Sequence, residues 1–211
     1  MAATLRPSIC AELDLQARGF SLVAGLDEVG RGSWAGPVVA AAVMLPLADG
    51  EALALLDGVR DSKTLPGDRR ASLAAIIYEV ATSVAVGRVT PPLVDRLGVA
   101  RAVRLAMVRA ISRLEPPPTA LALDAFALPE SALPQTYFPR ADASCLSVAA
   151  ASIVAKVYRD RTMVRYSKRF PQYYFARHKG YGTALHREAL AAHGPCAIHR
   201  TSFAPVAAAL R

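Results

Sequence analysis

Apolar residues gather in short runs whose length is typical of buried β-strands. Two runs near the N-terminus, SLVAGLDEV at 21–29 and GPVVAAAVML at 36–45, are joined by the short connection GRGSWA. Runs at 83–89 and 119–126 have the same character, and residues 134–140 are a candidate for a further strand. Short apolar runs bounded by Gly, Pro and polar residues predict strands at these positions.

Longer stretches repeat their apolar residues at helical spacing. This pattern predicts helices over 68–82 and 184–194. A long helix is predicted over 93–114, because two prolines precede it and three prolines follow it. An Ala-rich helix is predicted from 144 to about 169. Its second half is expected to present a basic face, solvated or lining a track for a duplex, made of Lys156, Arg159, Arg161, Arg165, Lys168 and Arg169.

The order of strands and helices indicates an α/β core with a small addition. Residues 1–170 hold all the predicted strands. Residues 171–211 are rich in aromatic and basic side chains and then become helical. We therefore expect an α/β core over 1–170 and a C-terminal helical extension over 171–211.

Composition narrows the class of protein. The chain has 211 residues, 53% of them hydrophobic, so it can bury a sizeable core. A net charge of +8 favours polyanionic partners, although a soluble basic protein without such a partner fits the charge equally well. The three cysteines form no C-x-x-C pair, and their odd number argues against a disulfide framework, so free thiols are expected.

The two segments most relevant to membrane insertion do not indicate a membrane protein. The N-terminal segment MAATLRPSICAELDLQARGF has no apolar stretch of the signal-peptide kind. The longest uncharged run, 33–48, contains prolines and is shorter than the roughly 20 apolar residues that a membrane helix needs. The sequence thus predicts a cytoplasmic protein that does not enter a membrane.

Four acids stand where predicted buried elements begin or end: Asp27, Glu28, Asp124 and Asp142. Each of them alone is commonly a turn or cap residue. Clustered carboxylates repel one another, so together they require cations. Hard divalent cations such as Mg²⁺ or Mn²⁺ prefer oxygen ligands and meet that requirement.

An acidic metal site in a basic protein suggests phosphoryl chemistry on a polyanion. Two metals about 3.5–4 Å apart activate a water and stabilise the leaving oxygen, so no protein nucleophile is needed. Adjacent strand residues point to opposite faces, so Asp27 and Glu28 share metals only if the backbone departs from ideal extension. Gly30 and Gly32 permit such a departure and a close approach to a ligand, but an ordinary tight turn has the same sequence.

Five blocks in fixed order resemble type 2 ribonuclease H, the ribonuclease HII family. They are GLDEVGRGSWAGPVVAAAV at 25–43, DSKTL at 61–65, ADASCLSVAAASIVAKVYRDR at 141–161, HKGYGT at 178–183 and HRTSF at 199–203. The resemblance implies a ribonuclease H-like fold, with a mixed five-stranded sheet flanked by helices and a C-terminal helical extension. It implies a metal-dependent endonuclease, using Mn²⁺ or Mg²⁺, that cuts the RNA strand of RNA–DNA hybrids and single ribonucleotides in duplex DNA. Products with 5′-phosphate and 3′-hydroxyl ends, and a monomeric enzyme in DNA replication and repair, are implied as well.

The resemblance also assigns roles to individual residues. The family's catalytic, metal-binding acids correspond to Asp27, Glu28, Asp124 and Asp142. A Gly-Arg-Gly loop reads the ribose 2′-hydroxyl through its backbone, a tyrosine senses the RNA–DNA junction, and a lysine contacts phosphate. These substrate-binding positions correspond to Gly30, Arg31, Gly32, Lys63 and Tyr181.

The chain departs from the family pattern at three places. Val29 follows the first acids where a small residue is usual, Ala125 follows the third acid where Gly is frequent, and Arg140 and Ala141 precede the fourth where Lys-Gly is common. All four acids are kept, so these changes bear on loop geometry.

Two other interpretations are weighed against this one. Type 3 ribonuclease H shares the fold but carries an N-terminal substrate-binding domain and typically Gly-Lys-Gly; here only 26 residues precede Asp27 and position 31 is Arg. A basic nucleic-acid-binding protein without catalysis explains the charge but not four acids in matching blocks. The histidines His178, His186, His193 and His199 lack a metal-ligand spacing, so surface or capping roles are expected for them.

Overall fold

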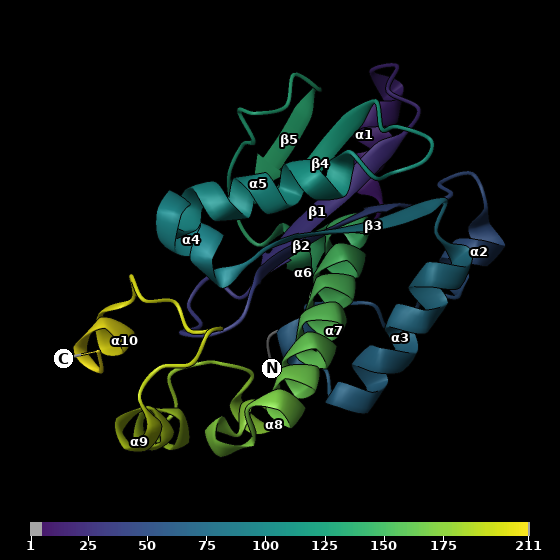
Figure 1. Ribbon diagram of the computed structural model, residues 1–211. Helices are drawn as coiled ribbons and strands as arrows, with labels where there is room; N and C mark the ends of the chain where they lie inside the picture. The colour runs from purple at the N-terminus through teal and green to yellow at the C-terminus, as the bar shows by residue number, and fades with distance from the viewer. Residues whose placement is uncertain (1–5, 211) are drawn as a thin grey trace.

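A mixed sheet forms the centre of the structure, a computed structural model that describes residues 6–210 (Figure 1). Its strands are β1 (Val23–Val29), β2 (Val38–Met44), β3 (Ser83–Val89), β4 (Ala120–Asp124) and β5 (Gln135–Phe138). Their order in the five-stranded sheet is β3-β2-β1-β4-β5. β2 pairs antiparallel with β1 and β3, whereas β4 pairs parallel with β1 and β5. The predicted fold class and all five predicted strand positions are confirmed.

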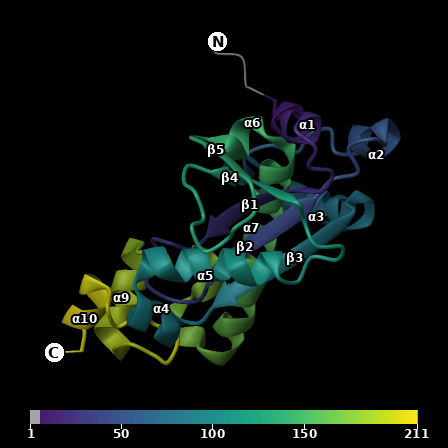
Figure 2. The same cartoon turned by 90° about the horizontal axis from the view of Figure 1, so that it is seen from above.

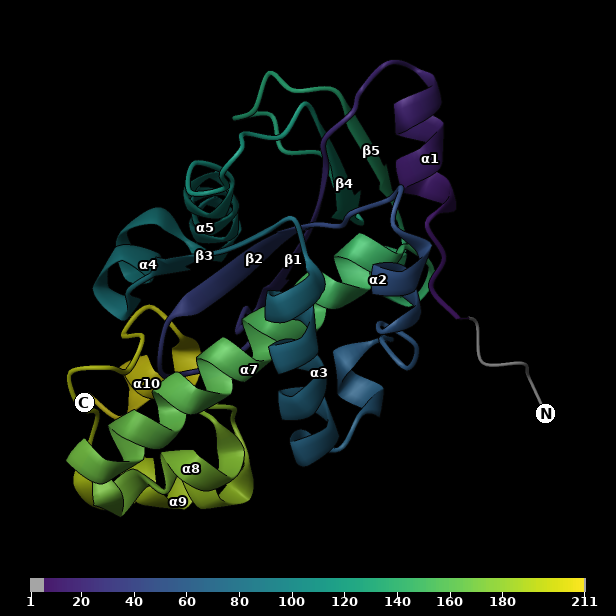
Figure 3. The same cartoon turned by 90° about the vertical axis from the view of Figure 1, so that its right-hand side faces the viewer.

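Helices cover both faces of the sheet (Figure 3). One face carries α4 (Pro91–Leu97) and α5 (Val99–Ile111), and the other carries α3 (Gly67–Val80) and α7 (Leu146–Arg169). The prediction of one long helix over 93–114 is wrong. Gly98 has φ 75° and ψ 157°, so it ends α4 and caps the start of α5, and the helix axis changes direction there.

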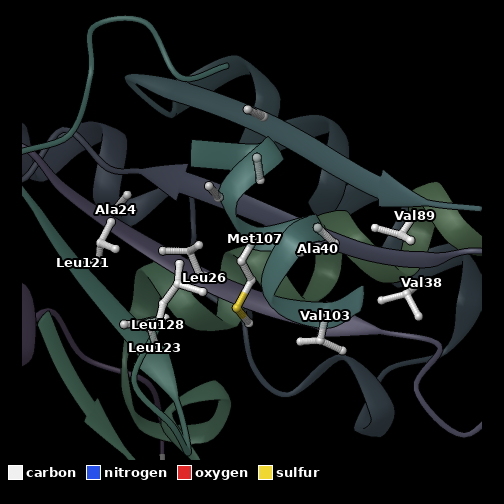
Figure 4. Packing of buried hydrophobic residues seen from close by; sticks show 14 of the residues in the cluster. Ala24, Leu26, Val38, Ala40, Val89, Val103, Met107, Leu121, Leu123 and Leu128 are labelled. Carbon is white, nitrogen blue, oxygen red and sulfur yellow. The ribbon is translucent and has the colours of Figure 1, made fainter. Parts of the chain in front are cut away.

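Small residues allow both helical layers to lie close to the sheet. Figure 4 shows Leu26 and Leu123 of the sheet packed with Val103 and Met107 of α5. On the other face, a Cβ added at Gly25 would stand 2.3 Å from the Ser147 hydroxyl oxygen, so only glycine lets α7 lie directly on β1. The first half of α7 is thereby held against the end of β1, where the acids lie.

The N-terminal part of the chain supports α7 from outside the sheet. The shorter elements of the core are α1 (Cys10–Ala17), α2 (Gly50–Ala54), the 3₁₀ turn η1 (Ser62–Thr64) and α6 (Ala141–Ser144). Glu12 of α1 is buried, and its Oε1 accepts the Ser147 amide at 2.8 Å. The predicted Ala-rich helix therefore begins at Leu146 instead of Ser144, with Glu12 satisfying its first turn. Residues 1–5 and Arg211 lie outside the described residues.

In the described part of the chain, the elements that follow α7 are all helical. They are the 3₁₀ turn η2 (Pro171–Tyr173), α8 (Phe175–His178), α9 (Ala184–His193) and α10 (Ala204–Ala208). Figure 2 shows α10 beside α4, and the Asp95 carboxylate of α4 accepts hydrogen bonds from Thr201 and Ser202, which lead into α10. The division at residue 170 stays a prediction. Among the described helices, none combines the length and the apolar character needed to cross a membrane. All three cysteines are free, as expected; Cys145 is buried and Cys10 is exposed.

Candidate active site

Three of the four predicted acids lie near the point where the parallel strands β1 and β4 end. The last pair in their register is Leu26 with Leu123, so Asp27 and Asp124 follow at the same edge of the sheet. The Asp124 Oδ1 accepts the Ala141 amide at 2.8 Å, which holds the start of α6 against β4. Asp142 comes next in α6, so this contact brings a third acid to the edge.

Asp27 and Glu28 leave β1 on opposite sides. Pairing with β2 continues regularly through Asp27, Glu28 and Val29, so the departure from ideal extension that we considered does not occur within this strand. Asp27 is buried, with 7% of its surface exposed, on the side of α7. Glu28 accepts a hydrogen bond from the Arg31 guanidinium at 3.0 Å.

Three of the acids have a raised pKa, chiefly because they are buried. Burial, followed by the charges of Glu28 and Asp142, raises the pKa of Asp27 well above its usual value. Burial also raises the pKa of Glu28, although the Arg31 guanidinium opposes this. For Asp124 burial is again the largest cause of a raised pKa, and the charge of Asp142 adds to it. Three carboxylates whose ionised forms are disfavoured provide a site that a cation would stabilise.

The acids surround the end of β1 without converging on one point. In the part of the chain that the structure describes, no three His, Cys, Asp or Glu side chains come together closely enough to hold a metal ion. Magnesium sites in phosphate-handling enzymes typically use one or two carboxylates and complete the shell with water and phosphate oxygens. Because no three of these carboxylates converge, a cation bound by them would need water and phosphate oxygens to complete its shell.

Lys63 joins this cluster from the DSKTL loop. Its Nζ lies 3.3 Å from Asp142 Oδ2, while its side chain remains 77% exposed. Burial lowers the pKa of Lys63, but the charges of Asp142 and Asp61 outweigh this and raise it overall. Asp61 also accepts the Lys63 amide at 2.9 Å, which fixes the turn that presents the lysine.

A pocket of about 470 Å³ brings two of the acids together with predicted substrate-binding residues. Its lining is Asp27, Glu28, Val29, Ser62, Lys63, Arg70, Ser152, Lys156 and Tyr181. A larger cavity of about 660 Å³ beside α2 contains none of the predicted site residues. We therefore place the functional site at the smaller, acid-lined pocket. Sequence reasoning missed Ser152. Its side chain hydrogen-bonds Asp27, and this contact depends on how α7 packs on β1.

The Gly-Arg-Gly loop is held from beneath by a buried arginine. Arg159 of α7 is fully buried and donates to the Pro37 carbonyl at 3.0 Å, the Ser33 hydroxyl at 2.7 Å and the Lys179 carbonyl at 2.9 Å. Gly30 has φ +92°, and a Cβ there would stand 2.3 Å from Arg159 Nε. The prediction that Arg159 belongs to an exposed basic face is wrong, because its guanidinium ties the loop at 30–37 to the loop at 178–183.

Arg200 supports the same loop and was missed by sequence reasoning. It is fully buried, and its Nη1 donates to the Arg31 carbonyl at 3.1 Å while Nε and Nη2 donate to the Gly36 carbonyl. In a trans peptide the C=O and N–H bonds point in opposite directions. The Gly32 amide therefore faces away from Arg200, and neither Arg31 nor Gly32 donates its amide to another described residue. Its place in the HRTSF block was the only signal for Arg200.

Tyr181 lines the same pocket as Asp27 and Glu28, from the turn at 178–183. The Arg159 Cζ is 5.4 Å and the Lys156 Nζ 5.8 Å from its ring centre. The turn around it is closed by the Tyr181 amide donating to the His178 carbonyl at 3.0 Å. The partly exposed ring is thus presented to the pocket by a basic, rigidly bonded turn.

Known proteins share this sequence and this arrangement. The model of the family described as Ribonuclease HII matches residues 24–206. The chain belongs to the ribonuclease HII family. It is 50% identical to the ribonuclease HII of Herpetosiphon aurantiacus over 200 residues, which cover 93% of this chain and 95% of that protein. It is also 50% identical to the ribonuclease HII of Chloroflexus aurantiacus over 204 residues, covering 97% and 96%.

Solved structures agree with the family. Ribonuclease H2 from Pyrococcus horikoshii superposes with a TM-score of 0.76 at 25% identity, covering 89% of this chain and 96% of that one. Ribonuclease HII from Archaeoglobus fulgidus, solved as a complex with PCNA, gives 0.73 at 29% identity, covering 90% and 97%. Bst-RNase HIII in complex with Mn²⁺ gives 0.71 at 25% identity, and the match covers 69% of that longer chain.

Membership decides between the interpretations weighed above. Ribonuclease HII enzymes are divalent-metal-dependent endoribonucleases that act on RNA–DNA hybrids. The family model and the curated relatives are of type 2, so the type 3 alternative is set aside. The alternative of a binding protein without catalysis is set aside for the same reason.

Proposed function

We propose that this ribonuclease HII, besides cutting RNA–DNA hybrids, incises duplex DNA at single embedded ribonucleotides and leaves 5′-phosphate and 3′-hydroxyl ends. The observation that supports this most directly is the pocket that joins Asp27 and Glu28 to Tyr181, with the Gly-Arg-Gly loop at its side. Acids for hydrolysis and a separate element for reading the neighbouring sugar then lie within one site. A single ribonucleotide offers both features at once, a 2′-hydroxyl and a deoxyribose beside it.

The four acids are the proposed ligands of two divalent cations, Mn²⁺ or Mg²⁺. When bound, such a pair activates a water for in-line attack and stabilises the leaving oxygen. Asp27 and Asp142 are at least nine-tenths buried, and Asp124 is fixed by its hydrogen bond to Ala141. These constraints orient the carboxylates before substrate arrives, while Lys63 and Arg31 balance part of their charge.

The Gly-Arg-Gly loop is proposed to select the ribonucleotide. The amides of Arg31 and Gly32 make no hydrogen bond to any other described residue, and Arg200 turns the Arg31 carbonyl inward. They are therefore available to bond a ribose 2′-hydroxyl. A site built to hydrogen-bond a hydroxyl rejects a substrate that lacks it, because its polar groups are then left unpaired.

Tyr181 is proposed to read the next sugar, where the RNA meets DNA. A ring packed closely on a deoxyribose would be crowded by a 2′-hydroxyl, which gives specificity by rejection. Lys63 is proposed to contact backbone phosphate, and residues 171–211 are proposed to form the extension that holds the duplex. A monomeric state and a cytoplasmic location stay predictions.

A gel-based cleavage assay tests this function. Three matched duplexes would be incubated with Mg²⁺ or Mn²⁺: DNA with one ribonucleotide, a uniform RNA–DNA hybrid, and DNA alone. We expect incision of the first two, with a 5′-phosphate on the downstream product, and none of the third. Cleavage of the hybrid without incision at the single ribonucleotide would contradict the proposal.

Asp124→Asn is the matched catalytic control for that assay. The amide keeps the oxygen that accepts the Ala141 amide, so α6 stays in place, but the charge needed by a cation is lost. Cleavage should be abolished while duplex binding survives, because phosphate contacts supply most of the affinity. Turnover near the wild-type value would remove Asp124 from the proposed ligands.

A further inference from the structure

Three histidines form a buried cluster behind Tyr181. His178, His186 and His199 have 8%, 0% and 3% of their surface exposed, so of the expected surface or capping roles the surface one is wrong for them. The rings of His178 and His186 stack with centres 4.4 Å apart and an angle of 13°. His199 also lies against His186, with ring centres 5.3 Å apart.

The hydrogen bonds of two of these rings allow only one arrangement of protons. The Cys196 amide donates to His199 Nδ1 at 2.9 Å, so the proton of His199 is on Nε2. That Nε2 lies 3.1 Å from His186 Nε2, which must accept. His186 therefore carries its proton on Nδ1, which donates at 3.0 Å to the Tyr181 carbonyl. The chain runs in one direction, from Cys196 to Tyr181.

His178 completes the cluster with a tautomer of its own. Its Nδ1 accepts the Gly180 amide at 3.1 Å, and its Nε2 donates to the Tyr173 carbonyl at 2.7 Å. A second proton on His178, His186 or His199 would set one donor against another. Burial lowers the pKa of His186 and of His199 to about 4, in agreement with neutral rings.

We propose that His186, oriented by His199, is a positioning residue for Tyr181. The Tyr181 carbonyl also accepts the Thr183 amide at 2.8 Å, so the two donors together fix the orientation of its peptide. The direction of that peptide sets where the ring stands over Arg159 and the pocket. Without the His186 donor only the Thr183 amide holds this carbonyl, so the peptide can tilt and the ring no longer meets the sugar at a fixed distance. The inference rests on the proposed role of Tyr181.

Nuclear magnetic resonance tests the proton arrangement directly. Long-range ¹H–¹⁵N spectra of the full chain with ¹⁵N-labelled imidazoles, at pH 7, report the tautomer of each ring. We expect His186 in the Nδ1–H form and His178 and His199 in the Nε2–H form, with the exposed His193 as the unconstrained reference. An Nε2–H tautomer at His186 would overturn the inference, since that ring then has no proton for Tyr181.

Substitution tests the positioning role. In His186→Asn the side-chain amide nitrogen stands near the former Nδ1, whereas in His186→Gln it stands near the former Nε2. We expect His186→Gln to lower kcat/KM about tenfold on the single-ribonucleotide duplex and less on the uniform hybrid, and His186→Asn to restore most of the loss. Equal losses on both substrates, or no rescue by Asn, would assign His186 to folding alone.

Tyr181→Ala, measured beside these variants, separates this inference from the proposed function. An unselective loss in Tyr181→Ala overturns the junction-reading role itself and the positioning role with it. A selective loss in Tyr181→Ala without one in His186→Gln overturns only the positioning role. Thermal unfolding of every variant shows how much of each loss comes from a less stable fold.

Discussion

The Lys63 ammonium lies 3.3 Å from Asp142 Oδ2, although 79 residues separate the two in the chain. The contact ties the DSKTL loop to the start of α6, one residue from the Ala141 amide that Asp124 holds. Lys63 remains mostly exposed, so the bond is open to water and to a substrate phosphate. If Lys63 contacts a substrate phosphate as proposed, it exchanges its bond to Asp142 for that phosphate as the duplex binds.

The first prediction concerns that exchange. Lys63→Ala should make the plot of log K against log salt shallower by about one unit, because one phosphate contact is lost. The measurement is duplex binding by fluorescence anisotropy at several salt concentrations. Arg101→Ala is the control, since Arg101 is exposed on α5, on the face of the sheet opposite α7. An unchanged slope for Lys63→Ala would remove the lysine from the phosphate contacts.

The stability of the metal-free protein should depend on Asp27. Its folded-state pKa is raised, so the folded state binds more protons than the unfolded state between the ordinary and the raised pKa. Stability from this group is therefore lost as the pH rises through that interval. Asp27→Asn removes the cost, and we expect it to stabilise the metal-free protein by about 1 kcal/mol at pH 7. Denaturant unfolding at pH 7 measures this.

Asp95→Asn provides a control of opposite sign for the same experiment. Hydrogen bonds from Ser202 and Thr201 outweigh burial and lower the pKa of Asp95. Its ionised form contributes stability that is present above the ordinary pKa and lost as the pH falls through the lowered one. Asp95→Asn should therefore destabilise the fold. A destabilising effect of Asp27→Asn would mean that its contacts outweigh the repulsion.

Cation affinity should rise with pH. Because burial and neighbouring acids raise the pKa of Asp27 and of Glu28, a cation has to displace protons from them at low pH. Isothermal titration with Mn²⁺ in buffers of different ionisation enthalpy would count the protons released. Fewer protons should be released as the pH rises, and none at any pH would contradict the assignment of these two acids.

The two glycines of the Gly-Arg-Gly loop should differ in their tolerance of a side chain. Gly30→Ala places a Cβ against Arg159 at a φ of +92°, so we expect a loss of about 1–3 kcal/mol in unfolding free energy. Gly32 has no atom within 4 Å of its added Cβ and no left-handed φ. Gly32→Ala should therefore leave the thermal midpoint nearly unchanged. Equal stability losses for Gly30→Ala and Gly32→Ala would show that the Arg159 side chain moves aside at little cost.

Tyr181→Ala should lower kcat/KM mainly on the single-ribonucleotide duplex. On a uniform hybrid every sugar of the RNA strand carries a 2′-hydroxyl, so packing of the ring is already impaired and less is lost. Tyr174→Ala is a matched control, because Tyr174 is 48% exposed in the same segment and lines no part of the site pocket. Its removal should affect both substrates little. Similar losses from both tyrosines would indicate a general role in binding.

The bounds of several elements could be predicted from the local sequence pattern alone. The strand over 83–89 has the bounds that its apolar run predicted, and α9 begins at Ala184 as predicted. Such segments are specified locally, because side-chain spacing decides which face is apolar. The break at Gly98 was missed because one glycine inside a helical pattern is often tolerated. Likewise α1 gave no periodic signal, and its buried Glu12 is explained only by the α7 turn that it caps.

The site divides in the same way. The identity of the four acids and of Gly30, Arg31, Gly32, Lys63 and Tyr181 was predicted from ordered sequence blocks, and their roles stay predictions. Burial of Arg159, Arg200 and His186 was decided only by the tertiary structure. Charged and polar residues are normally exposed, and burying them is tolerated only where distant carbonyls or ring nitrogens bond them. The bonding partners lie in the loop that leads into β2 and in the turn at 178–183. These segments are far apart in the sequence, so only the folded chain brings them together.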